Sequence, residues 1–127
     1  MQMQREGTSE LRPDQVRAMA HGLYYLAGID GITQREKDLI KSFLADGNVD
    51  LELDKLAELP FSLEELLFSL DTMFLRKTFI KVSVLLAKVD GHISAEELAE
   101  LRRLAQALEI DEPLESLELD LEGKTLE

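Results

Sequence analysis

The sequence predicts an all-α protein, a compact bundle of about six helices that contains a duplicated helix–turn–helix unit. Three observations support this fold class. Apolar residues recur at intervals of three and four rather than two. Leu, Ala and Glu are abundant, and only three of the 127 residues are proline. The pattern of Leu26–Glu36 recurs at Leu86–Glu97, and each copy places an Asp-Gly pair between two helical segments, as in a pseudo-twofold bundle.

The repeated segments carry the signals that end one helix and begin the next. Ser94 and Glu97 form a capping box, in which the hydroxyl accepts a backbone N–H bond and the glutamate reaches back to the cap. Thr33 and Glu36 repeat this box. The glycine of each Asp-Gly pair can enter, at little cost, the left-handed conformation that a helix C-terminus often needs. Asp-Gly is also a hairpin signal, but the three-to-four-residue period of the flanks excludes strands.

Helices are predicted wherever the apolar period is sustained between such signals. Pro13 suits a first helical position, and Pro60 ends a helix. Asp71 is the predicted cap of a long segment with few polar residues, which is therefore expected to be the central and most buried helix. Gly22 offers a position for close approach by another helix. The predicted helices cover residues 13–29, 34–45, 51–59, 62–68, 72–89 and 95–108.

The predicted core combines the inward positions of these helices with a stripe of large side chains. Such a stripe is more typical of a core than of a ligand pocket. The stripe consists of Phe61, Phe68, Met73, Phe74 and Phe79. The other inward positions include Leu39, Ile40, Phe43, Leu44, Leu53, Leu56, Leu59, Val84 and Leu85.

The length of the chain predicts one domain. Residues 1–11 are polar and are expected to form a disordered lead, and residues 12–110 form the helical domain. Residues 111–127 are an acidic C-terminal tail in which leucine alternates with acidic residues. Pro113 and Gly123 disfavour a long helix there, so a short docking helix over residues 114–119 is the alternative to an irregular tail.

The composition excludes several classes of function. The net charge of −12 disfavours nucleic acid as a partner, because binding to phosphates requires a basic patch. The chain has no cysteine, which excludes disulfides, thiolate metal sites and a cysteine nucleophile. No apolar run reaches the roughly 20 residues of a membrane-spanning helix, and the N-terminus lacks the apolar core of a signal peptide. A cytoplasmic protein is expected. Its charge suits a cationic partner or a metal ion, although solubility alone is the simpler explanation.

The repeated motif is similar to that of a known family. A helix that ends in Ala-x-x-Asp-Gly, followed by an aliphatic residue, Ser or Thr, two residues and Glu, resembles the TerB-like domain of tellurite-resistance proteins. A related domain occurs in some membrane-anchored co-chaperones. The resemblance spans Val16 to Leu108. It implies an all-helical bundle, a role in bacterial stress or tellurite resistance, and acidic residues that bind a divalent metal. Carried over by position, these metal ligands are Asp30, Glu36, Asp90 and Glu97.

The residues themselves leave two interpretations of the acidic turns. Asp30 and Asp90 follow helices whose C-terminal ends are already negative, so each carboxylate needs compensation. The commoner solution is an Asx-type turn, in which the carboxylate accepts backbone N–H bonds. The other is a hard cation, bound together with Glu36 or Glu97. Neither turn has the spacing of an EF-hand loop, and capping by the two glutamates competes with metal binding.

Three hypotheses of function follow. The favoured one is a non-enzymatic TerB-like domain that acts through a protein partner in a bacterial stress response, with calcium, magnesium or manganese bound at the turns; a homodimer is an alternative assembly. The second is a metal-dependent enzyme that uses the same carboxylates, and the third is a structural or regulatory module without a ligand. No catalytic Ser/His/Asp spacing, glycine-rich phosphate loop or HExxH motif supports an enzyme. His21 is interpreted as a half-buried packing residue, and His92 as a solvated loop residue or a further ligand.

Overall fold

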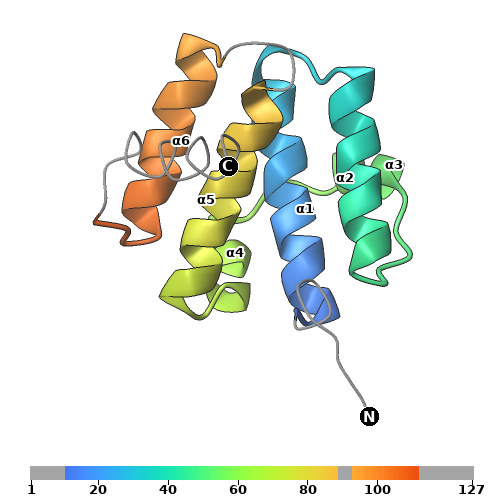
Figure 1. The fold of residues 1–127 in the computed structure, drawn as a ribbon, viewed down its shortest axis with the longest axis horizontal. Helices are drawn as coiled ribbons and strands as arrows, with labels where there is room; N and C mark the ends of the chain where they lie inside the picture. Colours follow the sequence, from blue (N-terminus) through green and yellow to red (C-terminus); the bar gives the residue numbers. More distant parts are fainter. Residues whose placement is uncertain (1–10, 89–92, 112–127) are drawn as a thin grey trace, which may run out of the picture.

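The computed structural model describes residues 11–88 and 93–111 as an all-helical bundle, which confirms the predicted fold class. Over these ranges it contains six α-helices, one short 3-10 helix and no strand. Figure 1 shows α1 and α5 in the middle of the view, with α2 and α6 on the two sides. The elements are α1 (Pro13–Ala27), η2 (Gly28–Asp30), α2 (Gln34–Asp46), α3 (Leu53–Glu58), α4 (Leu63–Ser69), α5 (Met73–Ala87) and α6 (Ala95–Ala107).

The duplication seen in the sequence extends to the lengths of the helices. α1 and α5 each contain 15 residues, and α2 and α6 each contain 13. α2 begins after Thr33 and α6 begins after Ser94, and both of these caps are capping boxes. α1 packs against α2 and α6, and α5 packs against α6 and α2. Each long first helix therefore contacts the second helix of both copies, so that the two copies share one core.

The first Asp-Gly turn has the predicted conformation at its glycine. α1 ends at Ala27, the chain continues as the 3-10 turn η2, and Gly31 then has a φ of 98°. This value lies in the left-handed region that favours glycine. The second Asp-Gly turn falls at residues 89–92, outside the described ranges, as do the predicted lead at residues 1–10 and the tail from residue 112.

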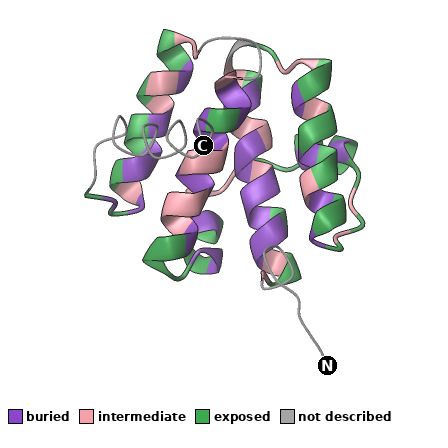
Figure 2. Cartoon of the chain, in the orientation of Figure 1, coloured by how far each residue is buried: buried purple, intermediate pink, exposed green. Residues whose placement is uncertain are grey.

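The most buried helix is α1, and the prediction that gave this place to α5 is wrong. Nine of the 15 residues of α1 are buried, against seven of the 15 in α5. Figure 2 shows the purple of buried residues along α1. The reason is the number of neighbouring helices, since α1 packs against α2, α3, α4, α5 and α6. The apolar content of a segment does not reveal how many elements surround it.

The predicted stripe of large side chains is divided between core and surface. Phe79 is fully buried, whereas Phe68 is 83% exposed and Phe74 is 75% exposed. Phe74 and Phe79 are five residues apart on α5, which places them about 140° apart around the helix. Only one of them faces the core. The other predicted core residues that are exposed are Leu39, Leu59, Met73 and Leu85.

Two glycines permit close packing in this core. A Cβ atom at Gly22 on α1 would lie 2.7 Å from the Cζ atom of Phe79 on α5. A Cβ atom at Gly47 would lie 2.7 Å from a methyl carbon of Val16. Side-chain carbons do not approach this closely, so both contacts require glycine. The close approach predicted at Gly22 is therefore present.

The N-terminal cap of α5 is Thr72 rather than the predicted Asp71. The Thr72 Oγ1 atom accepts a hydrogen bond of 3.1 Å from the backbone N–H of Leu75. Thr72 thereby satisfies a backbone N–H in the first turn of α5, which has no partner within the helix. Within the described residues, none of the helices combines the length and the apolar character needed to cross a membrane.

Candidate functional site

The two predicted glutamate ligands are part of helix caps. Glu36 and Glu97 are each only 4% exposed. The Glu36 Oε1 atom accepts bonds from the backbone N–H of Thr33, at 2.9 Å, and from its hydroxyl, at 3.2 Å. The Glu97 Oε1 atom accepts a bond of 3.5 Å from the backbone N–H of Ser94. Each carboxylate is therefore directed to the start of its own helix, as the capping boxes predict.

The two predicted aspartate ligands are only partly covered by the structure. The backbone of Asp30 ends η2, but its side chain is outside what the structure describes. Asp90 and His92 lie in the undescribed residues 89–92. Among the residues that are described, no group of three or more His, Cys, Asp and Glu side chains is arranged to hold a metal ion. Metal binding at Asp30 and Asp90 stays a prediction, and the geometry assigns Glu36 to capping.

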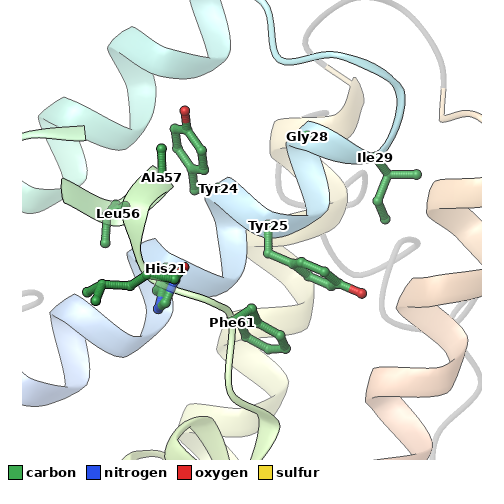
Figure 3. A pocket seen from close by; sticks show the side chains of 9 residues that line it. His21, Tyr24, Tyr25, Gly28, Ile29, Leu56, Ala57 and Phe61 are labelled. Atoms are coloured by element: carbon green, nitrogen blue, oxygen red, sulfur yellow. The ribbon is translucent and has the colours of Figure 1, made fainter. Parts of the chain in front are cut away.

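An aromatic pocket of about 320 Å³ lies beside α1 (Figure 3). The Tyr25 and Phe61 rings are stacked there, with centroids 4.5 Å apart and planes 11° apart. The His21 ring meets Phe61 edge-on at 6.0 Å. The His21 Nε2 atom is 3.0 Å from the carbonyl oxygen of Leu59. Because a carbonyl oxygen only accepts, this nitrogen carries the proton. His21 thus joins α1 to the segment after α3.

One wall of this pocket continues into a polar network between α1 and α6. The Tyr25 hydroxyl donates a bond of 2.8 Å to the Glu100 Oε2 atom. The Arg103 guanidinium donates to both oxygens of the same carboxylate, with its Nε atom 2.9 Å from Oε1. The bonds from Arg103 hold the pKa of Glu100 below its usual value, and the bond from Tyr25 adds to this effect. Burial raises the pKa of Tyr25, and its bond to Glu100 raises it further.

A second hollow, of about 250 Å³, lies between α2 and α5, and we refer to it as the α2–α5 groove. Leu39 on α2 and Leu85 on α5 line it and are 47% and 52% exposed. Its lining is mainly aliphatic and aromatic, and Asp46 is the one charged residue among the described residues that form it. The groove is lined by Leu23, Leu39, Ile40, Ser42, Phe43, Asp46, Val82, Leu85 and Leu86.

Leu39 and Leu85 are the surface residues that the sequence interpretation missed, because helical periodicity placed both of them inward. The repeat itself contained a signal. Leu85 occupies the position of Tyr25 in the other copy, and Leu39 occupies the position of Glu100. One copy thus has polar or amphipathic side chains where the other has leucine. Comparison of the repeats, rather than periodicity alone, marks these positions as unusual.

The groove has the chemistry of a docking surface. It offers apolar area and one carboxylate, that of Asp46. Exposed apolar surface of this kind, bordered by polar side chains, is typical of sites that bind proteins. Comparison of the sequence with models of protein families, and comparison of the chain with curated proteins and with solved structures, finds no match.

Proposed function

We propose that this chain is a non-enzymatic, TerB-like helical domain that acts through a protein partner in bacterial stress or tellurite resistance. The observation that carries the interaction role is the α2–α5 groove, at whose mouth Leu39 and Leu85 each leave about half of their side-chain surface in contact with water. Complete burial of an exposed leucine contributes roughly 1.5–3 kcal/mol, so covering the exposed half of each of these side chains at an interface contributes about half of that value. The paired helix–turn–helix units support the family resemblance.

The capping geometry supports this proposal over a metal-dependent enzyme. Such an enzyme would use Glu36 and Glu97 as ligands, but both carboxylates bond to their own helix starts. A ligand glutamate would have to leave its cap and expose the backbone N–H of the cap residue. A metal bound by Asp30 and Asp90 is compatible with the interaction role, which does not depend on it.

The proposal is tested by genetic complementation in the bacterium that encodes the chain. The gene is deleted and the strain is challenged with tellurite and with oxidants. We expect the deletion to increase sensitivity, and we expect the wild-type gene to restore resistance. A Leu39→Ser/Leu85→Ser variant, shown by circular dichroism to be folded, is expected to fail.

Phe68→Ser is the matched control, because Phe68 is an exposed apolar side chain outside the groove. It is expected to restore resistance fully. A deletion strain that tolerates every challenge as the parent does would contradict the stress role. Full complementation by the double serine variant would contradict the interaction role of the groove.

A further inference from the structure

We propose that the α2–α5 groove binds an aromatic side chain carried on an extended, positively charged segment of a partner protein. This inference rests on the proposed interaction function and specifies the chemistry of the partner. It follows from a comparison of the two copies of the repeat, because the equivalent place in the other copy is already filled by an aromatic side chain of this chain.

The two copies correspond residue by residue through their equal helix lengths. α1 and α5 correspond from Pro13 and Met73 onward, and α2 and α6 correspond from Gln34 and Ala95 onward. The contact between α1 and α6 is therefore the counterpart of the contact between α5 and α2. In this correspondence Tyr25 pairs with Leu85, Leu39 with Glu100, and Ser42 with Arg103.

The counterpart residues form a hydrogen-bonded network in one copy and line a groove in the other. Tyr25, Glu100 and Arg103 form the hydrogen-bonded network that joins α1 to α6. The residues in the same positions of the other contact, Leu39, Ser42 and Leu85, line the α2–α5 groove. Leucine side chains cannot form the bonds that hold the first contact together. The second contact is accordingly open, with an apolar lining.

In the contact between α1 and α6, which we refer to as the closed contact, Tyr25 is covered by Phe61. Its ring stacks on Tyr25 with centroids 4.5 Å apart, and its Cε1 atom lies 3.6 Å from where a Cβ atom of Gly22 would be. The residue that corresponds to Gly22 is Val82, which lines the groove. Phe61 therefore packs against the positions that correspond to Val82 and Leu85. A phenylalanine ring is the side chain that the same molecule places there.

The backbone conformation around Phe61 indicates the conformation of the partner segment. Phe61 follows Pro60 and lies between Leu59 and Ser62, whose backbones are both extended. An extended segment presents one side chain to the surface and leaves its backbone at the rim. The groove has room for a ring, because its volume of about 250 Å³ exceeds the roughly 150 Å³ of an apolar cavity that holds benzene.

Charge favours a cationic segment. α2 ends at Asp46, which lines the groove, and the C-terminal end of a helix carries negative potential. The chain as a whole has a net charge of −12, which attracts cations to its surface. A second copy of the chain is a poor source of this ring, because its two most exposed rings, Phe68 and Phe74, lie on α-helices and not on an extended segment.

The test uses a peptide that contains the Leu-Pro-Phe-Ser sequence of residues 59–62, with one lysine added at each end and with blocked termini. The peptide is titrated at low salt into the full chain labelled with ¹⁵N. We expect saturable shifts in the backbone amide signals of Leu39, Phe43 and Leu85. Replacement of the peptide phenylalanine by alanine is expected to weaken binding about tenfold or more, because the buried ring is lost. Replacement of both lysines by glutamate is expected to weaken it several-fold.

Variants of the protein test the comparison of the two copies. Leu39→Glu, Ser42→Arg and Leu85→Tyr together install the residues of the closed contact, and we expect this triple variant to lose peptide binding. If it does not fold, Ser42→Arg alone places a cation at an exposed position of the rim and is expected to weaken binding of the lysine peptide. Phe68→Ser is the control and is expected to bind as the wild type does.

Several results would overturn this inference. They are the absence of shifts at millimolar peptide, shifts centred on the aromatic pocket beside Tyr24, equal binding of the alanine peptide, and equal binding by a folded triple variant. Shifts in the groove that depend on protein concentration would show a second copy as the occupant. If complementation requires the groove but the peptide does not bind, only this inference fails. If the peptide binds but the deletion has no phenotype, only the proposed stress function fails.

Discussion

The Tyr25 hydroxyl donates a hydrogen bond of 2.8 Å to the Glu100 carboxylate, and this bond joins α1 to α6 across 75 positions of sequence. Arg103 holds the same carboxylate from the next turn of α6. The network fixes the position of Tyr25, whose ring stacks on Phe61 in the aromatic pocket. It therefore links the packing of the two copies to the shape of the aromatic pocket.

The Glu100 network makes a pH-dependent contribution to stability. The pKa of Glu100 is lower in the folded chain than its ordinary value of 4.5, chiefly because of the bonds from Arg103. Its stabilising contribution is thus fully present above about pH 4.5 and is lost as the pH falls through the folded pKa. Tyr25→Phe is expected to cost about 1 kcal/mol at pH 7, the typical net value of one hydrogen bond.

Urea unfolding of wild type, Tyr25→Phe and Glu100→Gln between pH 7 and pH 3 measures this contribution. We expect the stability difference between wild type and Glu100→Gln to decrease as the pH falls from about 4.5 toward the lower folded pKa, because the unfolded chain is protonated first, and to be lost once the folded carboxylate is protonated as well. A difference that stays constant over the whole range would show that the charge of Glu100 does not stabilise the fold.

The glycines of α1 and of the turn after it differ in the space around them. A Cβ atom at Gly22 would lie 2.7 Å from the buried Phe79 ring, whereas a Cβ atom at Gly28 would meet no atom within 4 Å. Gly28 also has an ordinary φ of −78°. We expect Gly22→Ala to destabilise the chain by roughly 1–3 kcal/mol through overpacking. Gly28→Ala is the matched control and is expected to be neutral or stabilising by up to about 1 kcal/mol.

Thermal unfolding of the two alanine variants distinguishes these outcomes. Equal melting temperatures for Gly22→Ala and wild type would contradict the close contact between α1 and α5. A large loss of stability in Gly28→Ala would instead indicate that this glycine is needed for the turn that follows α1.

The capping role of Glu36 predicts an effect that does not depend on metal. Glu36 accepts two bonds from Thr33, and the Thr33 hydroxyl accepts a bond of 3.1 Å from the Glu36 N–H. We expect Thr33→Ala and Glu36→Ala each to lower stability by about 1 kcal/mol, with Thr33→Ser close to wild type. The loss is expected to be the same with EDTA and with millimolar calcium, magnesium or manganese.

A metal site at the Asp-Gly turns is measured in the same experiment. A ligand at a hundred times its dissociation constant adds about 2.7 kcal/mol to stability. If one of these ions raises the melting temperature of the wild type, Asp30→Asn/Asp90→Asn is expected to abolish the increase and Glu36→Ala to retain it. Loss of the increase in Glu36→Ala would show that this carboxylate leaves its cap to bind the ion.

The sequence alone determined the local structure of this chain. The Thr33 and Ser94 caps and the left-handed Gly31 were predictable, because each depends on bonds or sterics within four or five residues. The predicted helix ends lie within two residues of the observed ends. Amphipathic periods then sufficed for the fold class, since six helices of this kind can bury their apolar faces only against one another.

Only the tertiary structure decided which apolar residues reach the surface. Leu39, Leu85 and Phe74 have the same local patterns as buried residues, yet they are exposed. Exposure depends on how many helices surround a given face, and this is set by partners far away in the sequence. The bond between Tyr25 and Glu100 and the open α2–α5 groove are the two results of that arrangement, because packing brings polar side chains together at one contact and leucines at the other.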